Sequence, residues 1–249
     1  MMTSISGSTV LVTGGQRGLG KAFVEAAIDL GAATVYATAR RPQPSADPRV
    51  VPLALEVTDP SSVAALADQA RDVSILVNNA GATLRKRLID TTVDELRDLL
   101  ETNLFGVLRV TQALAPTLAA NGGGTLINIH SAMSWIAGAG PYGVTKAALW
   151  SATNSLRIDL AAQGTQVVGV HLGYTETDMT AILDVVKNDP RELAHAVLVA
   201  AENGQTEVLS DEVSRHFKAA LSGPVEGLEF TLVDGKVVGK HASAAARRA

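Results

Sequence analysis

The 249-residue chain contains no cysteine. Disulfide bonds and thiolate metal sites are therefore excluded, because both need cysteine side chains. The chain also lacks an uninterrupted apolar stretch long enough to cross a bilayer. Its first residues lack the basic segment and the long apolar run of a secretory signal. These absences lead us to expect a cytoplasmic protein without a membrane partner.

Excess positive charge is absent as well. Lysine and arginine total 21 residues against 25 aspartates and glutamates, which gives a net charge of −4. No basic stripe appears, and this argues against nucleic acid as a partner. The five histidines are scattered without the spacing of metal ligands, so no metal site is predicted.

Hydrophobic residues make up 47% of the chain and charged residues 18%, as is typical of a folded globular protein. The length and the lack of a linker favour one domain over residues 1–239, followed by an Ala- and Arg-rich flexible tail at residues 240–249. Short β-branched runs, apolar on both faces, alternate with helical patterns, which predicts a doubly wound α/β fold with a parallel sheet covered by helices. The predicted strands are Thr9–Thr13, Ala33–Ala39, Val50–Val57, Val73–Asn78, Thr125–His130 and Gln166–Leu172.

Helix signals fill the gaps between these strands. An apolar repeat over Leu19–Leu30 predicts the first helix, and a capping box at Thr92–Glu95 opens a long helix that we expect to bend near Asn103 or Pro116. Residues 183–221 are predicted to be mostly helical, with a substrate lid at about 174–222. Residues 230–238 fit either a last strand or a hairpin that turns at Asp234-Gly235, and the role of residues 228–249 is left open.

A phenol and an ammonium group stand one helical turn apart in Tyr142-Gly-Val-Thr-Lys146, downstream of Ser131. Because positions i and i+4 share a helix face, the charge of Lys146 would favour ionisation of Tyr142. Lowering a tyrosine pKa from ~10 to about 7 takes roughly 4 kcal/mol. A close cation in a partly dry cleft, together with a second positive charge such as an oxidised nicotinamide, would supply much of that energy. The spacing therefore predicts a proton donor.

The segment Thr13-Gly-Gly-Gln-Arg-Gly-Leu-Gly20 joins the first predicted strand to the first helix. Backbone N–H groups and the helix dipole at such a junction favour phosphate. The glycines would permit the tight turn and the close approach of a pyrophosphate. An overlapping Gly15–Lys21 is similar to the P-loop of a nucleotide hydrolase, but Ala22 stands where that loop needs a magnesium-binding hydroxyl. We therefore favour a dinucleotide site over a hydrolase or a purely structural turn.

The end of the second predicted strand distinguishes the two dinucleotides. It reads Ala39-Arg40-Arg41 and carries no carboxylate for a ribose hydroxyl. Arginine suits a 2′-phosphate, and Arg17 in the glycine loop is able to reach the same group. The alternative is that Arg40 and Arg41 only solvate a strand end. The pattern favours NADP(H) over NAD(H).

Taken in order, the glycine loop, Asn78–Gly81, Asn103, Ser131 and the Tyr142/Lys146 pair resemble the short-chain dehydrogenase/reductase family, over about Ser6 to Met179. The resemblance implies a Rossmann-like sheet of about seven parallel strands. It also implies reversible hydride transfer between a nicotinamide and a small-molecule carbonyl or alcohol substrate, and homodimers or homotetramers formed through the helices that begin near Thr92 and Tyr142. A non-catalytic NADP(H)-binding sensor or scaffold with the same fold is the alternative.

The same resemblance assigns roles by position. Tyr142 would protonate the carbonyl oxygen and Ser131 would polarise it. Lys146 would lower the Tyr142 pKa and bind the nicotinamide ribose, while Asn103 would anchor a water that links Lys146 to solvent. The implied cofactor-binding residues are Gly14, Gln16, Arg17, Gly18, Leu19, Gly20, Arg40, Arg41, Glu56, Val57, Asn79, Ala80, Gly81, Tyr142, Lys146, Gly173, Thr175 and Thr177.

The chain departs from the family pattern at several positions. Glu56 stands where the family more often has Asp, Leu172 where it usually has Pro, and His130 replaces a small residue before Ser131. We expect His130 to be buried in the sheet rather than catalytic. Residues 133–141 form a slightly short substrate-side segment. The predicted substrate pocket is an apolar cleft for a hydrophobic carbonyl, with core packing as the alternative, and comprises Met133, Trp135, Tyr174 and Met179.

Overall fold

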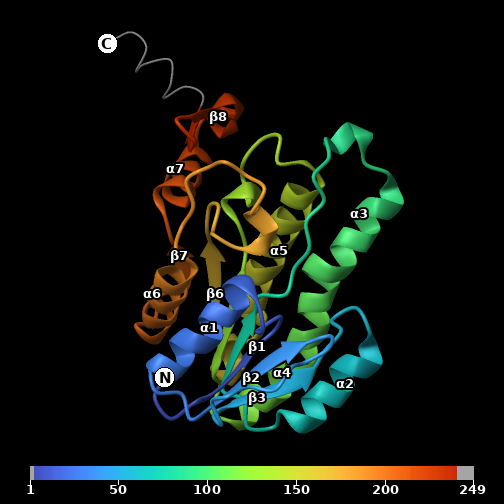
Figure 1. Cartoon of the computed structure of the whole chain (residues 1–249), viewed down its shortest axis with the longest axis vertical. Helices are drawn as coiled ribbons and strands as arrows, with labels where there is room; N and C mark the ends of the chain where they lie inside the picture. Colours follow the sequence, from blue (N-terminus) through green and yellow to red (C-terminus); the bar gives the residue numbers. More distant parts are fainter. Residues whose placement is uncertain (1–2, 240–249) are drawn as a thin grey trace.

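Seven parallel strands form the main sheet of the computed structural model, which describes residues 3–239 (Figure 1). Their order is β3-β2-β1-β4-β5-β6-β7, so the chain reverses its direction of travel across the sheet between β1 and β4. The predicted fold class is confirmed. The strands are β1 (Thr9–Val12), β2 (Thr34–Ala39), β3 (Val50–Ala54), β4 (Ile75–Asn78), β5 (Thr125–Ile129), β6 (Gln166–His171) and β7 (Glu207–Leu209).

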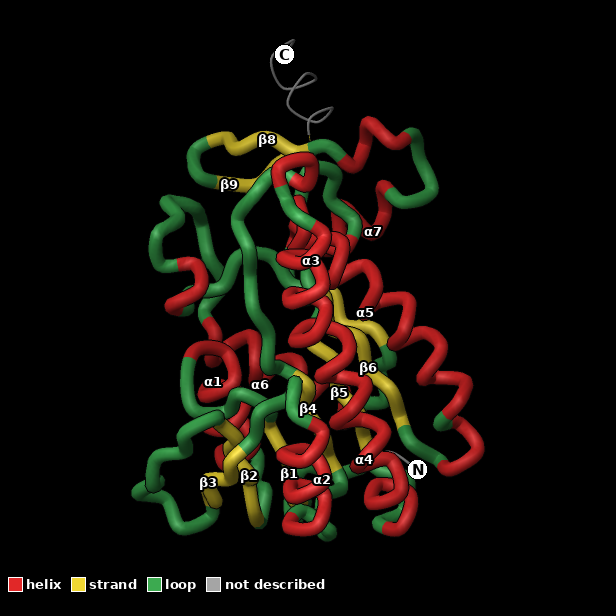
Figure 2. The backbone as a smooth tube through the Cα atoms, turned by 90° about the vertical axis from the view of Figure 1, so that its right-hand side faces the viewer, coloured by secondary structure: helices red, strands yellow, loops and turns green. Residues whose placement is uncertain are grey.

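Helices cover both faces of this sheet (Figure 2). Alternate residues of the central strands supply two separate cores, one on each face. In β1, Val10 and Val12 pack with the α1 and α6 side, whereas Leu11 packs with the α2 and α4 side. Each such buried side chain contributes on the order of 2 kcal/mol to stability. The helices are α1 (Gly18–Asp29), α2 (Pro60–Gln69), α3 (Val93–Leu100), α4 (Val107–Ala120), α5 (Gly140–Asp159), α6 (Pro190–Glu202) and α7 (Glu212–Ala220).

The long helix predicted from Thr92 is interrupted by a π-helical segment, Glu101–Gly106, which joins α3 to α4. This segment contains Asn103, so the regular α-helix is interrupted near that residue, while the predicted bend itself stays a prediction. Pro116 lies inside α4 without ending it. A Cβ atom on Gly106 would lie 2.8 Å from the Val57 side chain, so a glycine is needed for this close packing. π-helical segments of this kind occur frequently at functional sites.

The carboxyl-terminal third contains one strand that the sequence analysis missed. Residues 183–221 are mostly helical, as predicted, because α6 and α7 supply 13 and 9 of these residues. α6 packs along α1, and between the two helices Glu207–Leu209 pairs with β6 as the seventh strand. Residues 230–239 form an antiparallel hairpin of β8 (Phe230–Val233) and β9 (Lys236–Gly239). Asp234 and Gly235 both have positive φ, 49° and 72°, as a tight hairpin turn requires. The hairpin alternative is therefore confirmed.

The hairpin and α7 pack together above the carboxyl end of the sheet (Figures 1 and 2). The N–H of Val186 donates to the carbonyl oxygen of Gly235 at 2.9 Å, which ties the hairpin to the segment that follows β6. The predicted lid at 174–222 thus contains four different elements: the loop that follows β6, then α6, which covers the sheet, then β7 and finally α7. The predicted tail at 240–249 lies outside the described residues. Over residues 3–239, no helix has both the length and the apolar character needed to cross a membrane.

Replacement of Asp189 by alanine should destabilise the fold by about 1 kcal/mol, the usual value of a lost N-cap. The Asp189 carboxylate accepts N–H groups from Arg191 at 2.7 Å and Glu192 at 3.1 Å at the start of α6. Urea unfolding measures the loss, and Asp189→Asn should keep most of the stability because asparagine also caps helices. An Asp189→Ala protein as stable as the parent would contradict this role.

Candidate active site

The predicted site residues gather where β1, β4, β5 and β6 end. A reciprocal clamp joins the first two of these strand ends. The Thr13 hydroxyl oxygen accepts the N–H groups of Asn79 and Ala80, each at 2.9 Å, and the Asn79 side-chain amide donates to the Thr13 carbonyl at 2.9 Å. Asn79 and Ala80, both predicted to contact the cofactor, are thereby fixed beside the glycine turn.

The glycine turn has the shape of a dinucleotide cradle. A Cβ atom on Gly20 would overlap the carbonyl oxygen of Gly14, so the turn excludes any larger residue there. Gly18 has a φ of 51° and lies against the side chain of Thr177. No side chain caps the start of α1, so its N–H groups face an anion-binding position. Leu19 is different, because its side chain is buried in the core.

Gln16 has a role that the sequence did not reveal. Its side chain donates to the Gln43 carbonyl at 2.7 Å and accepts the Gln43 N–H at 2.9 Å. This pair ties the glycine turn to the loop after β2, which carries Arg40 and Arg41. Both arginines and Arg17 are exposed, and β2 ends without a carboxylate.

The side chains of Glu56 and Val57 are engaged within the protein. The Glu56 carboxylate accepts the Thr58 N–H at 3.3 Å and the Thr58 hydroxyl at 3.0 Å. Val57 is buried against Gly106. These contacts stabilise the turn before α2, and contact of this pair with an adenine ring stays a prediction.

The Tyr142 and Lys146 side chains share the first turns of α5, beside the end of β5. The Lys146 Nζ atom lies 5.8 Å from the centre of the Tyr142 ring and donates to the Ile129 carbonyl at 2.7 Å. Ser131, two residues beyond Ile129, lies beside Tyr142, and its hydroxyl acts to lower the Tyr142 pKa. Its hydroxyl oxygen also accepts the Met133 N–H at 3.2 Å. The structure therefore brings these three predicted catalytic residues together.

The electrostatics of the pair differ from the sequence expectation. Burial raises the pKa of Tyr142 to about 12, and the neighbouring Ser131 hydroxyl only partly opposes this rise. Burial also lowers the pKa of Lys146 to about 8. Lys146 is not among the causes that shift the Tyr142 pKa, so the expected lowering is absent from the protein alone. The desolvation of both groups explains the difference.

Asn103 uses its side chain to connect two parts of the site. Its Oδ1 accepts the Ala82 N–H at 2.8 Å, and its Nδ2 donates to the Ala82 carbonyl and to the Thr145 hydroxyl, both at 2.9 Å. Thr145 in turn donates to the Tyr142 carbonyl at 2.8 Å. Asn103 thus holds the loop after β4 against α5. The predicted water at Asn103 stays a prediction.

The loop after β6 contains Gly173, Thr175 and Thr177. The Thr175 hydroxyl is buried and has no hydrogen-bond partner among the described residues, as expected for an atom that awaits a ligand. Asp211, which the sequence analysis missed, accepts the Gly173 N–H and the Asn188 side-chain N–H, each at 2.6 Å. Asp211 also forms a capping box with Ser214 at the start of α7. That pattern indicates a helix start in the sequence, but it does not indicate the contact with Gly173.

The predicted substrate residues fall into two groups. Trp135 is buried and stacks on His171 with ring centres 3.8 Å apart, so core packing describes it. Met133 packs against the same cluster. Tyr174 is half-buried and Met179 is 39% exposed, and the Met179 carbonyl accepts a hydrogen bond from Arg85. Met133 is also only partly buried, so of the four residues Trp135 is buried and Met179 alone is exposed.

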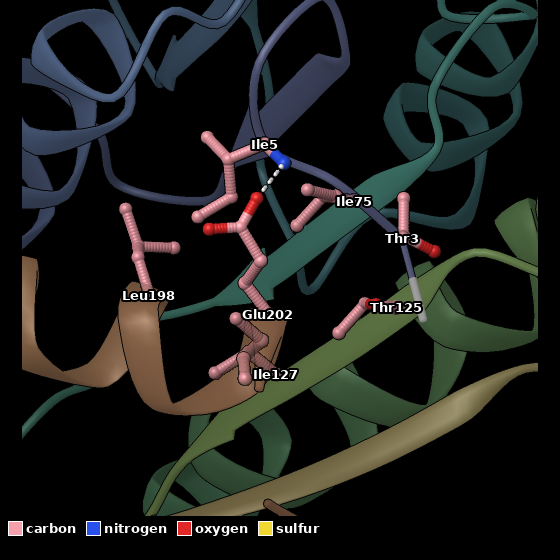
Figure 3. Close-up of a pocket in the computed structure, with 8 residues that line it drawn as sticks. Thr3, Ile5, Ile75, Thr125, Ile127, Leu198 and Glu202 are labelled. Carbon is pink, nitrogen blue, oxygen red and sulfur yellow. Dashed lines mark hydrogen bonds between the residues drawn. The ribbon is translucent and has the colours of Figure 1, made fainter. Parts of the chain in front are cut away.

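A separate small hollow lies at the amino-terminal ends of β4 and β5, away from the strand ends that carry the predicted site (Figure 3). It is lined by Ile75 and Thr125 at the starts of β4 and β5 and by Glu202 of α6. Glu202 accepts the Ile5 N–H at 2.9 Å there. None of the predicted site residues borders this hollow.

His130 is buried, as expected, and it contacts a second histidine that the sequence analysis did not connect with it. The His130 Nδ1 lies 3.0 Å from the Nε2 of His171. Burial is the main cause that lowers the pKa of both rings, well below the ordinary value for His130 and to about 3 for His171. The sequence did contain a signal for this contact. Each histidine directly follows the last β-branched residue of a predicted strand, in Ile129-His130 and Val170-His171, and these two strands are neighbours in the sheet.

The architecture and the ordered site residues together define an oxidoreductase class. Residues 8–185 match the family model of short chain dehydrogenases, and the chain belongs to this family. A curated relative, 3-oxoacyl-[acyl-carrier-protein] reductase FabG of Vibrio cholerae, is 32% identical over 222 residues, covering 80% of this chain and 91% of the relative. An NADP-dependent 3-hydroxy acid dehydrogenase of Schizosaccharomyces pombe is 27% identical over 241 residues, covering 84% and 93%.

Solved structures agree with this assignment. A short chain dehydrogenase from Burkholderia cenocepacia in complex with NADP superimposes with a TM-score of 0.83 at 33% identity, covering 89% of this chain and 95% of that one. Membership of the family implies a nicotinamide dinucleotide as cofactor. The glycine cradle, the uncapped start of α1 and the unpartnered Thr175 hydroxyl fit such a group.

The histidine pair predicts acid-sensitive stability. An imidazole with a lowered folded pKa binds its proton more readily in the unfolded chain, so stability is full above pH 6.5 and falls as the pH drops toward the folded pKa. At pH 5, His171 alone should cost about 2 kcal/mol. Urea unfolding at pH 7 and pH 5 measures this loss. In His171→Asn, the difference between the two pH values should shrink by about that amount, and an unchanged difference would contradict the assignment.

Proposed function

We propose that the protein is an NADPH-dependent reductase of a ketone or aldehyde, reversible as an alcohol dehydrogenase, with Tyr142 as general acid and base. The observation that carries this proposal is that the Tyr142 phenol lies next to the buried Ser131 and beside Lys146. A hydroxyl pair at the end of β5, next to the glycine cradle, suits a carbonyl oxygen that gains negative charge.

Bound NADPH would supply a hydride to the carbonyl carbon, and its oxidised form would add a positive charge near the phenol. Ser131 would donate a hydrogen bond to the carbonyl oxygen, and Tyr142 would transfer its proton to that oxygen. Lys146 has three N–H donors, of which one is used on Ile129, so two are left for ribose hydroxyls. The charge of Lys146 would also stabilise the phenolate after proton transfer.

The substrate class follows from the relatives and the lid together. One relative reduces a 3-oxoacyl group and the other acts on a 3-hydroxy acid, according to their names. Tyr174 and Met179 present apolar surface at the predicted entrance. We therefore favour a hydrophobic ketone or a 3-oxoacyl compound. For assembly, we favour a homodimer or homotetramer, because Phe105 and Val144 expose apolar surface near α3 and on α5.

Tyr142→Phe should lower kcat for ketone reduction by about 10²- to 10⁴-fold, the usual contribution of a general acid. NADPH oxidation with a panel of hydrophobic ketones, aldehydes and 3-oxoacyl thioesters measures it. Tyr36→Phe is the matched control, because the Tyr36 hydroxyl contacts only the surface carboxylate of Asp72. Full activity of Tyr142→Phe would overturn the mechanism.

The double variant Arg40→Ala/Arg41→Ala should weaken NADPH binding by about 10- to 100-fold, since hydrogen bonds to charged groups contribute about 1.5–3 kcal/mol. NADH binding should change little, because NADH lacks the 2′-phosphate. Fluorescence titration with both cofactors distinguishes these outcomes. Arg97→Ala, on the exposed face of α3, controls for the general loss of positive charge. Equal affinity of the parent protein for NADH and NADPH would refute the preference.

A further inference from the structure

Two buried histidines lie directly behind Ser131 and have no part in the proposed chemistry. His130 follows β5 and His171 ends β6, and the pairing of Ile129 with Val170 sets the two rings side by side. They are 1% and 0% exposed. A Cβ atom on Gly169 would lie 2.7 Å from His130, so this glycine makes the space that the ring occupies.

The hydrogen bonds of His171 fix which of its nitrogens carries the proton. Its Nδ1 lies 3.2 Å from the Ser131 carbonyl oxygen. A carbonyl only accepts, so Nδ1 must be the donor. In a neutral ring, Nε2 is then an acceptor, and the Nδ1 of His130 at 3.0 Å must donate to it. Both rings are therefore Nδ1–H tautomers.

The hydrogen bonds on the other side of His130, toward Thr153, run in the same direction from donor to acceptor. The His130 Nε2 is left as an acceptor, and the Thr153 hydroxyl lies 2.8 Å both from it and from the Leu149 carbonyl. Donation to Leu149 would leave the lone pairs of Thr153 and His130 facing each other, so in the neutral pair the hydroxyl donates to His130. Thr153 in turn accepts an N–H of Asn128 at 2.9 Å, and Asn128 accepts an N–H of Asn78 at 3.0 Å. These hydrogen bonds all donate in one direction, from Asn78 on β4 through Asn128, Thr153, His130 and His171 to the Ser131 carbonyl. We call this chain of hydrogen bonds the relay.

The surroundings keep both rings neutral. The charged groups that act on them are Lys146, Arg157 and Lys218, all positive, and each disfavours a further positive charge. Burial acts in the same direction. A protonated His130 would have to donate to Thr153, whose hydroxyl would then turn to the Leu149 carbonyl at 2.8 Å. The relay therefore keeps its single direction of donation only while both histidines are neutral.

The relay ends at Ser131, whose hydroxyl must have a fixed position in the proposed mechanism. The Ser131 carbonyl accepts both His171 and the Ser134 N–H, the latter at 3.0 Å. The next peptide is held as well, because Ala132 donates to the Leu172 carbonyl at 2.8 Å. The Ser131 hydroxyl, in contrast, has only long protein contacts besides Tyr142, at 3.2 and 3.4 Å. Its position therefore depends on its backbone.

We propose that His171, oriented by His130 and Thr153, is a positioning residue that fixes the Ser131 backbone so that the Ser131 hydroxyl meets the carbonyl oxygen of the substrate. This inference rests on the proposed reductase function. His171 acts through one N–H donor to the Ser131 carbonyl and transfers no proton to the substrate.

The tautomers test the relay without any turnover. Nitrogen-15 NMR of the histidine-labelled protein at pH 7 should show Nδ1–H forms for both His130 and His171, and Thr153→Val should perturb the Nε2 signal of His130. Thr111→Val is the matched control: Thr111 is equally buried and accepts only from Asn78, off the path to Ser131. An Nε2–H form of either ring in the parent protein would overturn the relay.

Two substitutions of His171 separate positioning from packing. His171→Phe keeps a ring to stack on Trp135 but removes the donor, whereas His171→Asn keeps an N–H at the Nδ1 position but loses the stacking. We expect kcat to fall about tenfold in His171→Phe and to be largely retained in His171→Asn, with KM for NADPH unchanged in both. Stability should follow the opposite order. If kcat instead follows stability, the role is only structural and the proposal is wrong.

A double-mutant cycle with Ser131→Ala completes the test. Ser131→Ala retains the backbone carbonyl but removes the hydroxyl that His171 positions. Adding His171→Phe to it should lower kcat no further, because residues that act through one another give non-additive losses. Additive losses of kcat would overturn the proposal. A parent protein that binds NADPH but reduces nothing in the panel would overturn the reductase function itself, and this failure is distinct from a wrong tautomer in an active enzyme.

Discussion

All strands of the main sheet run in one direction, and this constraint determines where the polar side chains of the site lie. Parallel strands place their carboxyl ends at one edge, so residues that follow β1, β4, β5 and β6 become neighbours although they are far apart in sequence. The Thr13–Asn79 clamp and the His130–His171 pair both join such strand ends. The arrangement of the site is thus a consequence of strand direction and register.

The sequence predicted those elements that carry a strong local pattern. Six β-branched runs became six strands, because each is long enough to show its apolar character. Near Asn103, where we expected a bend, the structure has a π-helical segment. The seventh strand, Glu207–Leu209, was missed. Three residues at a sheet edge show no periodicity, and only their pairing with β6 makes them a strand.

Site residues on one helix were easier to predict than contacts across the fold. The shared face of Tyr142 and Lys146 follows from helix geometry, whereas the direction of the Tyr142 pKa shift depends on burial, which no local pattern reports. Gln16 contacts Gln43, and Asp211 contacts Gly173, only because tertiary packing brings their loops together. Such pairs leave no signal in the spacing of the residues.

The bond between Val186 and Gly235 has a consequence for the order in which the protein is completed during synthesis. The six strands from β3 to β6 are present once residue 171 has been made, and α6 then covers the α1 face of the sheet with residues 190–202. The loop after β6 acquires its anchor at Gly235 much later. A chain that ends before this hairpin would therefore contain every strand of the main sheet but lack this anchor for the loop beside the predicted substrate site.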